Sequence, residues 1–158
     1  MHLTSFLAVL GASAALAAPA TVDGFGRRST NISQPFEVDR LYMSMDSVWD
    51  VSTGVDVKFT ATDLNTGVST FCNATDVLMN AVYACERDNT KWALNGDASK
   101  LSIEWFWPPG DISDNGVMAN YRANGSATID WNCASSGNGQ ECFSTKFNVP
   151  IQTIEAWA

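Results

Sequence analysis

The segment VDVKFTATDLNTGVSTFC, residues 55–72, decides the fold. Apolar residues occupy every second position at its start: Val55, Val57, Phe59 and Ala61. This two-residue period is typical of a strand with one face in a protein core. Asp63 to Gly67 contains turn-forming residues, after which an extended pattern resumes from Val68 to Cys72. The segment therefore predicts a β-hairpin.

The same alternation recurs along the rest of the chain. It predicts further strands over residues 36–42, 101–107, 117–123, 127–131 and 149–156. Asn124-Gly125 is expected to turn the chain between two of these strands, and residues 74–84 leave room for a short turn of helix. Many short strands with frequent turns indicate an all-β fold, either a single antiparallel β-barrel or a barrel-like sandwich.

The N-terminus has the pattern of a secretion signal. Residues 3–17 form an uncharged apolar run that ends in Ala15-Leu16-Ala17 and is too short to span a bilayer. We therefore predict a signal peptide over residues 1–17 and a secreted, extracellular protein. The pair Arg27-Arg28 is either a second processing site or two solvated arginines, so residues 18–28 are a short pro-segment or a flexible N-terminus. Residues 29–158 then form one β-barrel domain with a modest core.

The chain is acidic, with 9 basic and 17 acidic residues and a net charge of −8. Without residues 1–28 the counts become 7 and 16, or −9. Such a charge repels phosphate backbones and anionic lipid, so we expect no nucleic-acid partner and no membrane partner. It favours solubility and attraction to basic partners.

Four cysteines follow the signal, at positions 72, 85, 133 and 142. In an oxidising compartment they are expected to form two disulfides, for which three connectivities exist. We favour the local pairs Cys72–Cys85 and Cys133–Cys142, because each closes a short, turn-prone loop. The alternative is a four-thiolate zinc site. The twelve and eight residues between these partners do not resemble the close cysteine pairs that bind zinc.

Several segments together resemble a known family. They are Val38-Asp39-Arg40-Leu41-Tyr42, the strand over residues 55–62, Phe71-Cys72-Asn73-Ala74, Val82-Tyr83-Ala84-Cys85, and the loop from Asn132-Cys133 through Gly137-Asn138-Gly139 to Cys142. In order and spacing they resemble the secreted fungal family of the Alternaria alternata major allergen. The resemblance extends from about Phe36 to the C-terminus.

The resemblance implies a single antiparallel β-barrel with the same two disulfides and no catalytic residues. It also implies a role as allergen, elicitor of plant defence or virulence effector. The expected partners are host plant defence proteins, such as thaumatin-like proteins, or small phenolic ligands such as flavonoids. The chain lacks the additional cysteine that links the founding allergen into a dimer, so we expect a monomer or a non-covalent oligomer.

The residue types restrict the chemistry that is open to the mature chain. Its one histidine, His2, lies in the predicted signal, which leaves no histidine for a catalytic triad or a metal site. We expect no cofactor, no metal and no enzymatic activity. Hydrolysis by two carboxylates is the alternative, with Glu104, Asp111 and Asp114 as candidates, although solvated surface acids explain them more simply. Asp63 to Gly67 resembles the start of a calcium loop, but its twelfth position is Ala74, which favours a β-turn.

The aromatic run Trp105-Phe106-Trp107 has two interpretations. It is either a sugar-stacking platform or part of a core strand. Alternation places both tryptophans on the face of the apolar residues, which favours the core. Phe106 then shares the opposite face with Glu104, and we assign these two residues as a candidate partner contact.

Three sequons make the chain a candidate glycoprotein, at Asn31, Asn73 and Asn124. If Cys72 points into the core, Asn73 points to solvent, which suits a glycan. Asn124 is expected in an exposed turn. The sequence thus predicts a secreted, non-enzymatic β-protein that acts by binding, with a small carbohydrate-binding or two-carboxylate carbohydrate-active protein as the alternative.

Overall fold

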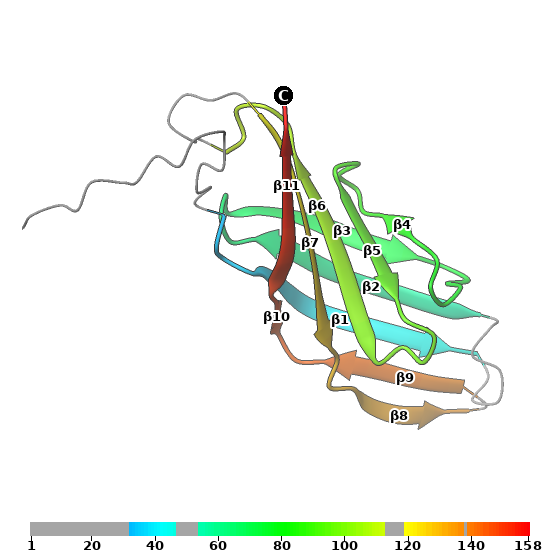
Figure 1. The fold of residues 1–158 in the computed structure, drawn as a ribbon. Coiled ribbons are helices and arrows are strands. Elements are labelled where there is room, and N and C mark those ends of the chain that lie inside the picture. Colours follow the sequence, from blue (N-terminus) through cyan, green and yellow to red (C-terminus); the bar gives the residue numbers. More distant parts are fainter. Residues whose placement is uncertain (1–31, 47–53, 113–118, 138) are drawn as a thin grey trace, which may run out of the picture.

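The computed structural model describes residues 32–46, 54–112, 119–137 and 139–158, and this part of the chain is all β (Figure 1). The strands form two antiparallel sheets, as the sequence predicts. The predicted signal peptide and pro-segment, Asn31 and Asp114 lie outside the described residues.

The first sheet contains the hairpin that the sequence predicts over residues 55–72. Its strands in spatial order are β3 (Val68–Ala74), β2 (Val55–Asp63), β1 (Phe36–Met45), β9 (Gly139–Ser144) and β8 (Asn132–Ser136). A further strand, β10 (Phe147–Val149), pairs with the first residues of β1. β1 changes partner from β10 to β9 at a bulge, where Arg40 adopts a φ of 55°.

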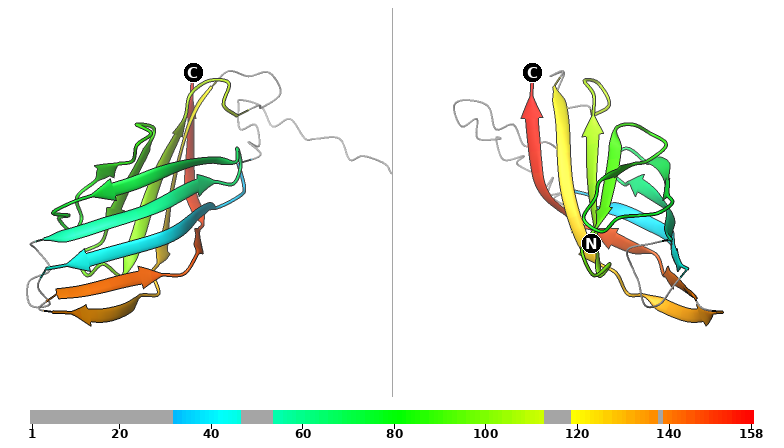
Figure 2. Two further views of the ribbon diagram at one scale, coloured as in Figure 1. Left: turned by 180° about the vertical axis from the view of Figure 1, so that it is seen from behind. Right: turned by 90° about the vertical axis from the view of Figure 1, so that its right-hand side faces the viewer.

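The second sheet crosses the first, and the core lies between them (Figures 1 and 2). Its strands in order are β11 (Ile151–Trp157), β7 (Asn120–Thr128), β6 (Lys100–Trp107), β5 (Thr90–Leu94) and β4 (Tyr83–Ala84). The strand order of each sheet has two ends and does not close on itself. The fold is therefore a barrel-like sandwich and not a closed barrel. Of the two architectures that the sequence predicts, the sandwich is the one that forms.

Aromatic side chains from both sheets fill the core. Phe36 of β1 stacks on Trp105 of β6, with ring centroids 5.7 Å apart. Phe59 of β2 meets Trp92 of β5 edge-on at 5.4 Å. Trp105 and Trp107 are each 1% exposed, which confirms that the two tryptophans of the aromatic run belong to the core and not to a sugar platform.

Both predicted disulfides are confirmed, and the zinc alternative is wrong because the described chain has no free cysteine. Cys72–Cys85 joins β3 of the first sheet to the residue that follows β4 of the second. Cys133 and Cys142 are direct cross-strand partners in β8 and β9. One bridge therefore connects the sheets, and the other reinforces the edge of the first sheet.

Two strand boundaries differ from the sequence prediction. Asn124-Gly125 does not form the predicted turn. Both residues lie within β7, which continues to Thr128. A Cβ on Gly125 would overlap the carbonyl oxygen of Pro150, so this glycine permits the close approach of another segment instead of a turn. Pro150 also divides the predicted strand 149–156: β10 ends before it in the first sheet, and β11 begins after it in the second.

The helical turn predicted for residues 74–84 does not form. Asp76 and Asn80 have positive φ angles of 52° and 65°, which a right-handed helix does not tolerate. The segment instead leads from β3 to β4, and Val77 anchors it in the core with 1% exposure. Ile129 and Trp131 likewise lie in the connection to β8 and not in the strand predicted over residues 127–131.

The turn at Asp63 is a hydrogen-bonded hub and not a calcium loop. The Asp63 carboxylate is fully buried, and its Oδ2 accepts hydrogen bonds from Trp107 Nε1 at 2.7 Å and Thr66 Oγ1 at 2.6 Å. Its Oδ1 accepts from both nitrogens of Asn65, and Asn65 Oδ1 accepts in turn from the backbone of Gln34. One carboxylate thereby links the hairpin turn, the start of the described chain and the second sheet.

Replacing Trp107 by Phe should show how much the fold depends on this link. The change keeps an aromatic ring but removes the donor to Asp63, and hydrogen bonds to charged groups contribute about 1.5–3 kcal/mol. The free energy of unfolding, measured by urea denaturation with the disulfides intact, should fall further in this variant than in the control. The difference between the two losses should be about 1.5–3 kcal/mol.

The control is Trp92→Phe, because Trp92 is equally buried and its Nε1 has no hydrogen-bond partner among the described residues. Both variants lose the same atoms from the core. Equal losses in the two variants would contradict a special role for the Trp107–Asp63 hydrogen bond.

Candidate functional site

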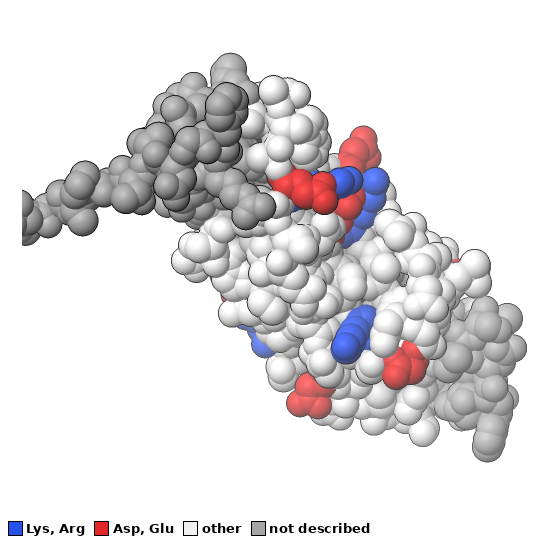
Figure 3. Space-filling view, viewed as in Figure 1, with Lys and Arg blue, Asp and Glu red and all other residues white. Residues whose placement is uncertain are grey.

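The outer face of the second sheet carries the two residues that the sequence assigns to a partner contact. Alternation along β6 buries Trp105 and Trp107 and turns Glu104 and Phe106 to the opposite face, as predicted. Acidic and basic side chains gather over the upper part of this face, and most of the remainder is uncharged (Figure 3). We call this solvent-facing side of the second sheet the outer face.

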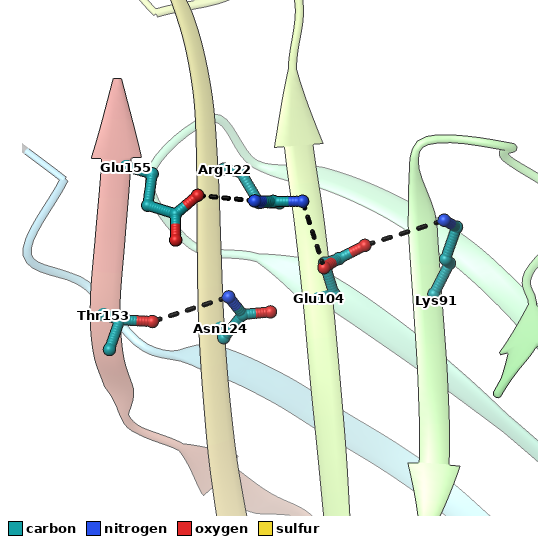
Figure 4. A network of polar contacts seen from close by, with 6 residues as sticks. All are labelled: Lys91, Glu104, Arg122, Asn124, Thr153 and Glu155. Atoms are coloured by element: carbon teal, nitrogen blue, oxygen red, sulfur yellow. Dashed lines mark hydrogen bonds and ion pairs between the residues drawn. The ribbon is translucent and has the colours of Figure 1, made fainter. Parts of the chain in front are cut away.

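A row of alternating charges crosses the outer face, with one residue from each of four strands (Figure 4). Lys91 of β5 lies 3.7 Å from Glu104 of β6, and Glu104 lies 3.9 Å from Arg122 of β7. Arg122 donates a hydrogen bond of 2.5 Å to Glu155 of β11. That bond, together with the charge of Glu155, raises the pKa of Arg122. Because the pairs are exposed they add little stability, but they hold four side chains in one row.

An aromatic pair lies beside this row. Phe106 stacks on Trp157 with ring centroids 5.8 Å apart, and the Arg122 guanidinium also lies 5.8 Å from the Trp157 ring. Trp157 remains 43% exposed, so Phe106 lies against a larger and more accessible ring. Sequence analysis missed Trp157, because it lies one residue beyond the strand predicted over residues 149–156.

Next to the charged row the outer face is hollowed, with a volume of about 600 Å³. Amide and hydroxyl groups line much of the hollow, including those of Asn124, Ser126 and Gln152. Gln152 Nε2 donates to Ser126 Oγ at 3.0 Å, and Asn124 Nδ2 donates to Thr153 Oγ1 at 3.5 Å. The hollow thus offers polar groups that are already oriented by their neighbours.

Within the part of the chain that the structure describes, β11 forms a free edge of the sheet. It pairs with β7 on one side and stands at the end of the strand order. From Gln152 to Trp157 every residue is exposed, so both faces of the strand are open to solvent. An edge strand of this kind presents unpaired backbone groups that another polypeptide can pair with.

A second cavity lies at the end of the sandwich where β1 and β9 meet the turn between β5 and β6. It has a volume of about 210 Å³ and a largely apolar lining that includes Met43, Met45, Met79, Trp131 and the Cys133–Cys142 disulfide. Trp131 is held by a 2.7 Å hydrogen bond from Nε1 to the carbonyl oxygen of Ala98. We call this cavity the methionine cleft. Sequence analysis did not find it, because its walls come from five separate segments.

The carboxylates proposed for hydrolysis are not brought together by any contact among the described residues. Glu104 is engaged by Lys91 and Arg122, whereas Asp111 is exposed in the turn that follows β6. Asp114 falls outside the described ranges. Among the described residues, Glu104 is therefore part of the charged row and is not paired with Asp111.

The described sequons differ in setting. Asn73 lies near the end of β3 and is exposed, as the inward position of Cys72 predicts. Asn124 is half-buried in the middle of β7, so the prediction of an exposed turn there is wrong.

Comparison with known proteins finds no matching family model and no matching curated protein. Within the residues that the structure describes, no group of three or more His, Cys, Asp or Glu side chains is placed to hold a metal ion. Nor does any helix there have the length and apolar character that crossing a bilayer requires. The two disulfides indicate an extracellular or secreted protein.

The rim of the methionine cleft yields a prediction about pH. Asp97 Oδ1 accepts hydrogen bonds from Ser99 Oγ at 2.6 Å and Ser99 N at 3.1 Å, and these lower the pKa of Asp97 from 3.8. Because folding lowers the pKa of Asp97, its carboxylate stabilises the folded state at pH values above the pKa of the unfolded chain. This contribution is lost as the pH falls through the pKa of the folded state. Carboxyl NMR titration should give Asp97 a midpoint below 3.8.

Ser99→Ala removes the strongest of these hydrogen bonds and should move the midpoint upward. Ser102→Ala, on the neighbouring strand, is the control and should leave it in place. An unchanged midpoint in Ser99→Ala would contradict the proposed cause.

Proposed function

We propose that this chain is a secreted, non-enzymatic binding protein that captures a partner polypeptide with β11 and the adjoining outer face. The observation that carries the proposal is the exposure of β11 on both faces and along one edge. A partner strand can pair with that edge, and alternate side chains then read its sequence. This arrangement supports recognition of an extended segment of another protein.

The side chains around β11 fit such a role. Aromatic residues and arginine dominate the energetics of protein interfaces, and here Trp157 and Arg122 lie in contact at the edge of the sheet. Glu155 and Glu104 keep the guanidinium in place, so little conformational freedom is lost on binding. The outer face therefore combines an accessible anchor with neighbours that orient it.

The partner class comes from the resemblance to the Alternaria major-allergen family. We propose a fungal elicitor, effector or allergen whose partners are host plant defence proteins, such as thaumatin-like proteins. The net charge of −9 without residues 1–28 favours a basic partner and speeds encounter with it. Predicted secretion through the segment 1–17 would bring the protein to the plant surface.

Capture from plant apoplastic fluid tests the proposal, with the disulfide-intact protein immobilised. Wild type should retain a defence protein saturably, and Trp157→Ser should weaken capture by about tenfold or more because it removes the accessible anchor. Leu78→Ser is the matched control, since Leu78 is 58% exposed but lies in the connection between β3 and β4.

Equal capture by the Trp157 variant and wild type would overturn the assignment to β11. Soluble plant and fungal polysaccharides are offered in the same assay. Retention of a polysaccharide without any protein would favour the carbohydrate-binding alternative, for which the amide-lined hollow beside Glu104 supplies the polar groups.

The methionine cleft supports a second candidate function, the binding of a small phenolic ligand. A largely apolar cleft with a few fixed polar groups is the usual form of a small-molecule site, and methionine adapts its shape to flat rings. Trp131 in the wall provides a fluorescent reporter.

Titration with the flavonol quercetin should quench tryptophan fluorescence saturably. Met79→Glu places a charge in the cleft and should weaken binding by about tenfold. Leu78→Glu alters the neighbouring residue, which does not line the cleft, and should bind as wild type does. Equal affinity in the two variants would place the ligand elsewhere.

A further inference from the structure

A second surface, on the outer face of the first sheet, is not used by the proposed function. Asn73 of β3, Lys58 of β2 and Tyr42 of β1 are successive cross-strand partners. Alternation turns all three away from the core, on the side of the sheet that faces the viewer in the left panel of Figure 2. With strands about 4.8 Å apart, the row spans two strand spacings from Asn73 to Tyr42.

The row borders a hollow of about 340 Å³. Its lining includes Tyr42, Lys58, Asn73 and Thr75, with Ser44 and Asp56 supplying further polar groups. Lys58 Nζ lies 4.5 Å from the centre of the Tyr42 ring, and no carboxylate among the described residues pairs with it. The long lysine side chain is therefore free to leave the ring when another group enters.

Asn73 is presented at one side of this hollow. Its side chain is exposed and makes no hydrogen bond to any residue that the structure describes. Pairing of β3 with β2 ends at Ala74, so Thr75, the third residue of the sequon, lies beyond the ladder and is exposed. Asn124, by contrast, lies within β7 and donates its amide hydrogen to Thr153.

We propose that Asn73 carries an N-linked glycan and that its first sugar lies in this hollow, over Lys58 and against the Tyr42 ring. Attachment follows from the predicted passage through the secretory pathway. Asn73 Nδ2 would bond to the anomeric carbon of a lipid-diphosphate-linked oligosaccharide, lose one proton, and release the lipid diphosphate with the bonding electron pair.

The hollow matches the chemistry of N-acetylglucosamine. One face of a pyranose ring carries C–H groups and packs on an aromatic ring, whereas its hydroxyl and acetamido groups need polar partners. Tyr42 supplies the ring, and Ser44 and Asp56 line the same hollow. The glycan would also cover the half-buried Tyr42, which is the cross-strand partner of the exposed Phe143 of β9.

Occupancy is tested on the full chain secreted from a eukaryotic host. Peptide mass spectrometry after amidase release of glycans, which converts an occupied asparagine to aspartate, should find Asp at position 73. Thr75→Ala should abolish this conversion, and Thr75→Ser, which keeps the sequon, should retain it. An unmodified Asn73 in the wild-type protein would overturn the proposal.

The position of the sugar is tested by a double-mutant cycle on the melting temperature. In the wild-type background, the glycosylated Thr75→Ser protein should melt about 2–4 °C above the unglycosylated Thr75→Ala protein. Tyr42→Ser should abolish that difference, whereas Phe143→Ser should preserve it, since Phe143 neighbours Tyr42 but does not line the hollow.

The same difference in all three backgrounds would show that the glycan extends into solvent and would overturn its placement on Tyr42. Because each comparison is made within one background, any loss of stability from the Tyr42 change itself cancels. The test is independent of partner capture by β11.

Discussion

The buried carboxylate of Asp63 is the constraint on which much of the structure depends. A charge removed from water must be compensated, and four hydrogen bonds from three residues do this here. One of them comes from Trp107, so the end of β2 is fixed against the end of β6 and the two sheets are held at this corner. The other bonds shape the hairpin turn, whose Asn65 in turn binds the backbone of Gln34.

A second constraint acts where the chain changes sheets. Pro150 separates β10 from β11, and Gly125 lets the Pro150 carbonyl approach closely. This crossing carries β11 to the open edge of the second sheet, where its residues are exposed on both faces. The exposed strand β11, which supports the proposed partner capture, thus results from the change of sheet at Pro150.

The two outer faces differ in chemistry, although one alternation pattern generates both. On the second sheet, four strands contribute a row of alternating charges next to the Phe106–Trp157 pair. On the first sheet, a row runs from Asn73 through Lys58 to Tyr42 and carries a sequon. The proposed face for a protein partner and the proposed face for a glycan can therefore coexist on a small domain, because the core separates them.

The sequence by itself determined which residues of most strands face inward, the pairing of the cysteines and the exposure of Asn73. These depend on period-two alternation and short loops, which are local properties of the chain. Only the tertiary structure decided the rest. Asn124-Gly125 continues a strand because Pro150, distant in sequence, packs against Gly125. The charged row combines residues from four separate strands and the methionine cleft from five separate segments. Local periodicity carries no information about which segments meet.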